Sequence, residues 1–301
     1  MRITLEQAAA RIREGGLVAF PTETVYGLGA NALDASAVAK IFALKRRPAS
    51  SPLIVHAASK EMARELVTEW PAKAEELATR YWPGPLTLVL PKSAKIPDIV
   101  TAGLPTVGVR VPAHPMARRL IEAADLPIAA PSANTFTRLS PTTAQHVIDE
   151  FGDSVDVLDG GPSQVGIEST VVSLVGGTLT LLRPGMISLG EIERATDPLG
   201  ESHPAPGMHP KHYSPRTRLL LVETPEALPD RSGAYVWWNT ARITARSIKM
   251  PAEPSPYAAR LYGALHQLDQ EGWPWIAVEA PPNTPEWAAV LDRLRRASFP
   301  L

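Results

Sequence analysis

Short β-branched and aliphatic runs alternate with amphipathic stretches along this chain, and this alternation constrains the fold more than any other feature. Seven such runs predict strands, over residues 17–20, 53–56, 86–90, 106–111, 128–130, 170–174 and 178–183. Apolar residues at helical spacing predict helices over 3–14, 36–44, 60–67, 72–81, 115–124 and 142–151. Thr4 is the expected N-cap of the first helix. Strands that alternate with helices favour an α/β domain built on a large sheet.

The composition changes between Glu191 and about Thr217, where prolines and histidines replace most large apolar residues. This composition is typical of a linker. Beyond it, strands are expected over 218–222, 233–238 and 275–279, and helices over 255–270 and 284–297. We therefore predict one domain over residues 1–195, a linker over 196–217 and a small α/β domain over 218–301.

Bulk composition excludes several classes of protein. The 301 residues include no cysteine, so disulfides, thiol nucleophiles and thiolate metal sites are ruled out. A net charge of -1 argues against strong direct binding of nucleic acid. No apolar run is long enough for a membrane span, and the first 14 residues lack a signal-peptide pattern. A cytoplasmic protein is expected.

The segment 21–29, PTETVYGLG, follows a predicted strand and carries hydroxyls, a carboxylate and a tyrosine before a Gly-x-Gly turn. It predicts either a binding loop or an ordinary polar loop whose glycines adopt positive φ. Residues 27–32 also fit a loose dinucleotide fingerprint, but the acidic residue expected about 20 positions later is missing. No P-loop sequence is present, so any ATP site is of another kind.

Cationic residues stand at two places where a site is plausible. Lys45, Arg46 and Arg47 precede Ser51 and could grip a polyphosphate, or they could be a solvated helix end. Arg110 lies inside an alternating strand and needs an anionic partner if it is buried, either a substrate carboxylate or a structural Asp or Glu.

Three segments carry small polar residues. Segment 130–134 (APSAN) follows a strand and suits close approach to a ligand, although turns have the same composition. Segment 140–143 (SPTT) resembles a hydroxyl-rich helix start, which could be simple capping, and 166–172 (GIESTVV) stands at the mouth of a β-rich run. His56 and Arg183 end two other strands. Three histidines, His203, His209 and His212, lie in the linker without a cysteine or nearby carboxylate, so no protein metal site is predicted.

Together and in order, these motifs resemble one family. FPTETVYGLG, K-x-RP, PLIVH, TVGVRVP, APSAN, SPTTA, ESTVV and LLRPG follow each other as in YrdC-like domains. The linker APGMHPKHYSP and the final DRLRRA are similar to the long members of that family, the threonylcarbamoyl-AMP synthases. The resemblance spans nearly the whole chain.

This resemblance implies a fold and a reaction. The fold is a twisted YrdC-like α/β domain with a basic central cavity, joined by the linker to a small Rossmann-like α/β domain. The reaction joins L-threonine, bicarbonate and ATP, with Mg²⁺, into threonylcarbamoyl-AMP and pyrophosphate. The product would pass to a tRNA threonylcarbamoyl transferase complex, with no membrane involved.

The resemblance also assigns residues. Catalysis would involve Lys45, Arg47 and Arg110, with no clear general base. L-threonine would be held by Thr24, His56, Arg110, the backbone of Ala130, and Ser169. ATP would be held by Arg47, Ser51, Thr106, Ser132, Ser140, Arg183 and Tyr213. Arg46 and Ser51 depart from the glycine and asparagine that the family often has there.

Two alternatives stay open. One is a related enzyme that makes carbamoyl adenylate from carbamoyl phosphate, although such domains normally sit in larger, cysteine-containing chains. The other is an RNA-binding module, which would show a steep salt dependence of its affinity for RNA.

Overall fold

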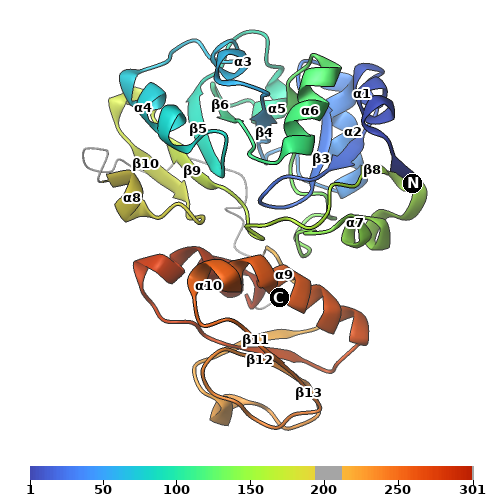
Figure 1. The fold of residues 1–301 in the computed structure, drawn as a ribbon, viewed down its shortest axis with the longest axis vertical. Helices are drawn as coiled ribbons and strands as arrows, with labels where there is room; N and C mark the ends of the chain where they lie inside the picture. The colour runs from blue at the N-terminus through green and yellow to red at the C-terminus, as the bar shows by residue number, and fades with distance from the viewer. Residues whose placement is uncertain (194–211, 300–301) are drawn as a thin grey trace.

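The computed structural model describes residues 1–193 and 212–299 of the chain, which contain two separate sheets. The first sheet has ten strands in the order β1-β8-β2-β3-β7-β4-β6-β5-β9-β10 (Figure 1). Its strands are β1 (Arg2–Ile3), β2 (Val18–Phe20), β3 (Gly27–Asn31), β4 (Ile54–His56), β5 (Leu86–Pro91), β6 (Thr106–Arg110), β7 (Ile128–Ala129), β8 (Asp156–Leu158), β9 (Thr170–Ser173) and β10 (Thr180–Arg183). Parallel and antiparallel pairs are mixed within it. The predicted large α/β sheet is confirmed.

Eight helices accompany this sheet in the described residues. They are α1 (Leu5–Arg13), α2 (Ala35–Lys45), α3 (Lys60–Arg64), α4 (Ala72–Tyr81), α5 (Asp98–Thr101), α6 (Pro115–Ala124), α7 (Ala144–Phe151) and α8 (Leu189–Glu193). The predicted N-cap is confirmed: the Thr4 hydroxyl accepts a hydrogen bond from the Gln7 backbone N–H, and the Gln7 side chain bonds back to Thr4. Sequence periodicity therefore located the longer helices well, but it did not reveal the short helices α5 and α8.

The Gly-x-Gly segment is a strand and not the predicted turn. Gly27 and Gly29 belong to β3, which pairs antiparallel with β2, and neither has a positive φ. The glycines are needed for space. A Cβ at Gly29 would lie 2.7 Å from atoms of both Phe20 and Ile128. Because the glycines of β3 have no side chain, the neighbouring strands can carry bulky residues beside them.

Gly29→Ala should lower the melting temperature of the first domain, because a methyl group there must displace Phe20 or Ile128. Overpacking of this kind costs about 1–3 kcal/mol. Gly263→Ala is the matched control, because a Cβ at Gly263 in the second domain meets nothing within 4 Å. That change should stabilise its helix by up to about 1 kcal/mol. Calorimetry on both variants tests these two predictions. An unchanged melting temperature for Gly29→Ala would contradict the first of them.

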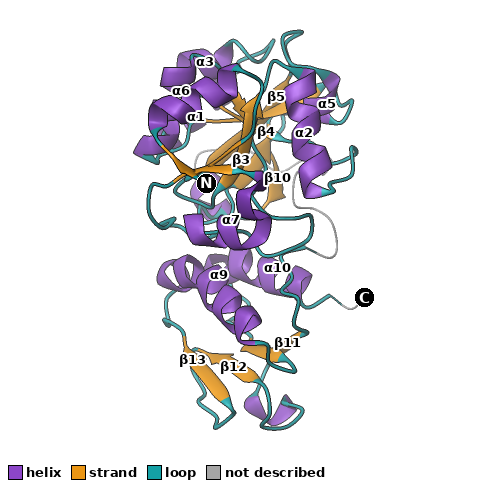
Figure 2. Ribbon diagram, turned by 90° about the vertical axis from the view of Figure 1, so that its right-hand side faces the viewer, coloured by secondary structure: helices purple, strands orange, loops and turns teal. Residues whose placement is uncertain are grey.

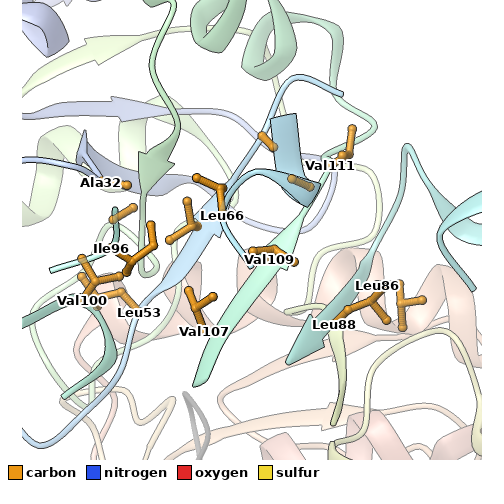
Figure 3. Close-up of a cluster of buried hydrophobic side chains, with 14 of the residues drawn as sticks. Ala32, Leu53, Leu66, Leu86, Leu88, Ile96, Val100, Val107, Val109 and Val111 are labelled. Carbon is orange, nitrogen blue, oxygen red and sulfur yellow. The ribbon is translucent and has the colours of Figure 1, made fainter. Parts of the chain in front are cut away.

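Aliphatic side chains from both ends of the sheet form the main core of the first domain. Figure 3 shows Val107 and Val109 along β6, with Leu86 and Leu88 of β5 beside them. All four are at most 1 % exposed. This packing places the ends of β4, β6 and β9 rigidly, and those ends carry the polar residues described below.

The second domain is a four-stranded parallel sheet in the order β11-β14-β12-β13. Its strands are β11 (Leu219–Val222), β12 (Ala234–Trp237), β13 (Arg246–Lys249) and β14 (Ile276–Glu279), and its helices are α9 (Pro254–Glu271) and α10 (Ala288–Ala297). The edge strand β13 was not predicted, because only Ile248 of its four residues is buried. The strands β1 and β8, which are two and three residues long, were not predicted either.

Helices α9 and α10 lie between the second sheet and the first domain (Figures 1 and 2). The two domains therefore meet through these helices, and α7 of the first domain lies above them in Figure 2. Most of the predicted linker, residues 196–211, lies outside the described residues, including His203 and His209. The exact domain limits stay a prediction.

Two histidines stack across this domain interface. The rings of His146 on α7 and His266 on α9 are 3.9 Å apart at 22°. His146 Nδ1 accepts from the Thr142 N–H, and His266 Nε2 donates to the Ser140 carbonyl. Burial, and next its neighbour His266, lower the pKa of His146 to about 4, while Asp149 opposes the shift. Burial also lowers the pKa of His266. Both rings are therefore neutral at pH 7.

Lowering the pH from 6.5 towards 4 should destabilise the protein in part through this histidine pair. The unfolded chain takes up protons at its ordinary histidine pKa of 6.5, whereas folded His146 resists protonation until about pH 4. His146→Phe should reduce the loss of melting temperature between pH 7.5 and pH 5 relative to the unaltered protein. Because other buried histidines titrate as well, the test is the difference between the two pH slopes. Identical slopes would disprove this role.

Candidate active site

A single cavity gathers the conspicuous polar motifs of the sequence. It lies among the ends of β4, β6 and β10, the segments after β2 and β7, and the described start of the segment before β11. Its lining residues are Thr22, Thr24, Val25, Gly27, Arg47, Pro52, Leu53, Ile54, His56, Arg110, Ala130, Pro131, Ser132, Glu168, Ser169, Arg183, His212 and Tyr213.

Arg110 is the centre of one wall. His56 and Arg110 end adjacent parallel strands and are paired in register. Arg110 is 3 % exposed, and it donates to the Gly84 carbonyl at 3.1 Å and to the Thr24 hydroxyl at 3.1 Å. Its Nη2 lies 2.6 Å from Glu23 Oε1. The anionic partner that Arg110 requires is therefore a structural carboxylate, which leaves its role toward a substrate carboxylate a prediction.

Burial and ion pairing act in opposite directions on this wall. Burial would raise the pKa of Glu23, but the Arg110 guanidinium lowers it further and holds the carboxyl below its usual range. Burial, and next the Arg110 charge, lower the pKa of His56 to about 3. Glu23 is therefore ionised and His56 neutral at pH 7. A neutral imidazole can accept a hydrogen bond from an ammonium or hydroxyl group of a ligand.

Arg47 and Lys45 come from the end of α2 but occupy different positions. Arg47 lines the cavity, where it donates to the carbonyls of Ser51 and Pro52 at 3.4 and 3.1 Å. Burial lowers its pKa to about 10, so it stays charged at pH 7. Lys45 is 1 % exposed and does not line the cavity. Its ammonium donates to the Ser132 carbonyl at 2.6 Å and to the Asn134 carbonyl, so it braces the segment after β7.

Ser169 and Arg183 form the opposite part of the lining. Arg183 Nε donates to the Ser169 carbonyl at 3.1 Å, and its Nη2 donates to the Ser169 hydroxyl at 3.0 Å. The same hydroxyl lies 2.8 Å from Thr87 Oγ1. Burial lowers the pKa of Arg183, because a desolvated cation is unfavourable. Arg47, Arg110 and Arg183 thus give the cavity its cationic character.

Four buried polar atoms of lining residues have no hydrogen-bond partner within residues 1–193 and 212–299. One is Arg110 Nη2, which is ion-paired with Glu23, and the other three are His56 Nδ1, His212 Nδ1 and the Tyr213 hydroxyl. Tyr213 also has a positive φ of 60°. Burial lowers the pKa of His212 to about 3 and raises that of Tyr213, so both are neutral. Buried polar groups are nearly always satisfied in proteins, so these three atoms mark a place for a ligand.

The structure brings most of the predicted site residues together. Those that line the cavity are Thr24, Arg47, His56, Arg110, Ala130, Ser132, Ser169, Arg183 and Tyr213. Four do not line it: Lys45, Ser51, Thr106 and Ser140. Thr106 begins β6, opposite Pro91 of β5, and Ser140 is fully buried with its hydroxyl 2.5 Å from Glu168 Oε1. Their roles toward ligands stay predictions.

Glu168 is the main lining residue that the sequence did not assign to the site. It is 6 % exposed, and its carboxylate is held by Ser140, Tyr262 and Arg293. The position of Glu168 next to the predicted site residue Ser169 could have indicated that it belongs to the site. Its partners from the second domain could not be predicted from the sequence. His212 was noted only as a linker histidine, and its position in the lining depends on the tertiary structure.

Two features are absent from the described residues. No group of three or more His, Asp or Glu side chains there could hold a metal ion. No helix in the same part of the chain is both long and apolar enough to cross a membrane.

The fold and the cavity define a two-domain α/β enzyme whose larger domain holds a cationic ligand site. Residues 10–185 match the family model for Sua5, YciO and YrdC, described as "Telomere recombination". Residues 187–298 match a model described as "Threonylcarbamoyl-AMP synthase, C-terminal domain". The chain belongs to the threonylcarbamoyl-AMP synthase family, in its two-domain form.

Named relatives match nearly the full length of this chain. The threonylcarbamoyl-AMP synthase of Pyrococcus abyssi is 44 % identical over 97 % of this chain and 93 % of its own length. That of Bacillus subtilis is 40 % identical over 98 % of this chain and 92 % of its own length. A crystal structure of P. abyssi Sua5 complexed with L-threonine superposes with a TM-score of 0.91 at 41 % identity. The superposition covers 99 % of this chain and 96 % of the P. abyssi chain.

Proposed function

We propose that the chain is a nucleotidyltransferase that joins L-threonine, bicarbonate and ATP into threonylcarbamoyl-AMP and releases pyrophosphate. The observation that carries this proposal is the set of three unsatisfied polar atoms, on His56, His212 and Tyr213, in a cavity lined by three arginines. Such a cavity suits a ligand with several acceptors and negative charges. The L-threonine complex of the P. abyssi relative supports the amino-acid part of the proposal.

Threonine is assigned to the wall made by Thr24, His56, Arg110, Ala130 and Ser169. Neutral His56 accepts a hydrogen bond from the ligand, and Arg110 has guanidinium hydrogens beyond those bound to Gly84 and Thr24. ATP is assigned to the wall that contains Arg47, Ser132, Arg183 and Tyr213. The two walls share one cavity, so the two substrates would meet inside it.

The chemical step unites two anions. Threonine and bicarbonate form N-carboxythreonine with loss of water, and a carbamate oxygen then attacks the α-phosphorus of ATP. The new bond is carbamate oxygen to phosphorus, and the broken bond joins the α-phosphorus to the oxygen that leaves with pyrophosphate. Arg47 and Arg183 offset the negative charge of both groups during this approach. Holding the reactants in one cavity supplies the rest of the rate acceleration, since positioning alone accelerates such reactions greatly.

Magnesium is proposed as the counter-ion that arrives with ATP, where it neutralises phosphate charge. The lining carboxylate, Glu168, is already bound by Ser140, Tyr262 and Arg293. No metal-binding cluster exists among the described residues either. The described residues thus offer no cage of their own for a metal, and no step is assigned to one.

Pyrophosphate release tests the proposal. Release from ATP and Mg²⁺ should require L-threonine and bicarbonate together and yield an AMP adduct that contains threonine by mass spectrometry. Release that ignores threonine but needs carbamoyl phosphate would favour the carbamoyl-transferring alternative. No release, with salt-dependent RNA binding instead, would favour the RNA-binding module. Transfer of the product to a tRNA-modifying complex and a cytoplasmic location stay predictions.

A further inference from the structure

Arg293 of the second domain reaches into the wall of the first domain. It lies on α10, is 1 % exposed, and is the largest fully buried side chain among the described residues. Its Nε donates to Glu168 Oε2 at 2.7 Å and its Nη1 donates to the Pro184 carbonyl at 2.9 Å. Its guanidinium carbon lies 5.2 Å from the centre of the Tyr213 ring. One side chain thus contacts three different segments.

All three segments belong to the cavity. Glu168 and Tyr213 line it directly, and Pro184 follows Arg183, which lines it as well. The Glu168 carboxylate in turn accepts from the Ser140 hydroxyl at 2.5 Å, and Tyr262 of α9 donates to it at 3.2 Å. Two helices of the second domain therefore hold one carboxylate of the first.

The ion pair controls the charge of Glu168. Burial would raise the pKa of Glu168, but Arg293 first and Arg183 second hold it below its usual range, with a hydrogen bond from Ser140 adding to the effect. An ionised Glu168 accepts hydrogen bonds from both hydroxyl partners. A protonated one would donate one proton and disturb this arrangement.

We propose that Arg293 is a positioning residue: it orients Glu168, Ser140 and the turn after Arg183 so that the second domain completes the ATP side of the cavity. This inference rests on the proposed function for its kinetic consequence. Arg293 touches no assigned substrate group itself and acts through Glu168 and Pro184. It gives the second domain a function that neither cavity motifs nor sequence order reveal.

The central test is Arg293→Gln, with Arg293→Lys, Glu168→Gln and the double variant Arg293→Gln/Glu168→Gln beside it. Arg295→Gln is the matched control, because Arg295 lies two residues further along α10 on its exposed face. Steady-state kinetics with ATP and threonine would be measured from pH 6 to 9. Amide hydrogen exchange in the segments 166–173 and 183–187 gives a readout that needs no activity.

Arg293→Gln should lower kcat/KM for ATP about 10- to 100-fold at pH 7, because a misplaced wall impairs positioning. Its activity should rise with pH as Glu168 ionises, whereas Arg295→Gln and the unaltered protein should not show this rise. Arg293→Lys should recover part of the rate because it restores the charge. The double variant should stay slow and lose the pH dependence. Exchange in both segments should be faster for Arg293→Gln and for the double variant, but not for Arg295→Gln.

Opposite results would overturn the inference. Arg293→Gln with unaltered kinetics and exchange would show that the contacts do not position the cavity. A loss of activity equal to the unfolded fraction, without a new pH dependence, would reduce Arg293 to a stabilising contact. If Arg293→Gln does not fold, Arg293→Lys and the double variant decide in its place. An unaltered protein without threonine-dependent release would refute the proposed function, and hydrogen exchange would still test the positioning role.

Discussion

Arg183→Gln should lower threonine-dependent pyrophosphate release by about 10²- to 10³-fold, the loss typical when a charge-stabilising donor is removed from an active site. The folded protein should not be destabilised to match. Burial disfavours the Arg183 cation, and Arg293 and Arg110 repel it, whereas Tyr213 and Glu168 favour it. The net effect lowers the pKa of Arg183, so its charge costs free energy in the folded protein. The melting temperature of the ligand-free variant should therefore be equal to that of the unaltered protein, or higher.

In the same melting experiment, ATP should change the melting temperatures of the unaltered protein and of Arg183→Gln by different amounts. A ligand that binds the folded state raises the melting temperature, so ATP should stabilise the unaltered protein more than Arg183→Gln. Arg183→Lys should be intermediate, because it keeps the charge but loses the planar fork that reaches both the Ser169 carbonyl and its hydroxyl. Arg119→Gln, at an exposed position on α6, is the control and should behave as the unaltered protein. Full activity of Arg183→Gln would contradict the role of this arginine.

Arg110→Gln should destabilise the protein by about 3–5 kcal/mol near pH 8, because it leaves the Glu23 carboxylate buried without its cation. The pH dependence has a defined sign. In the unaltered protein Arg110 lowers the pKa of Glu23, so the ion pair contributes stability above pH ~4.3 that is lost at lower pH. In the variant, burial is opposed only by the backbone hydrogen bonds at Ala113 and Glu23, so the pKa of Glu23 rises. The stability difference between the two proteins should therefore shrink between pH 8 and pH 5 in urea unfolding.

A double variant separates stability from binding at this position. Arg110→Gln/Glu23→Gln removes both charges, so it should recover most of the lost stability. It should not recover threonine affinity, measured by calorimetry, because the Thr24 hydroxyl and Gly84 carbonyl no longer have a guanidinium beside them. Recovery of both properties would show that Arg110 serves only to neutralise Glu23. A constant stability difference between pH 5 and pH 8 would show that Glu23 does not titrate as proposed.

Local sequence alone determined the elements whose periodicity and caps are strong. Helix α4 was predicted at 72–81, where it is found, and the Thr4 cap forms as expected. The long strands β5 and β6 were predicted to within one residue at each end. These elements are encoded by residues close to one another in the chain, so side-chain spacing and capping chemistry suffice to locate them.

The ordered motifs also indicated which residues surround the cavity, because several of them lie at strand ends, and strand ends meet at the edges of a sheet. The partners of those residues could not be predicted in the same way. Glu23 neutralises Arg110 across 87 positions of sequence, and Arg293 holds Glu168 across 125. Lys45 was predicted to bind phosphate, but its side chain is bound by backbone carbonyls. Sequence determined the elements and the candidate residues; only tertiary structure decided their charge partners, because burial and ion pairing depend on segments that meet after folding.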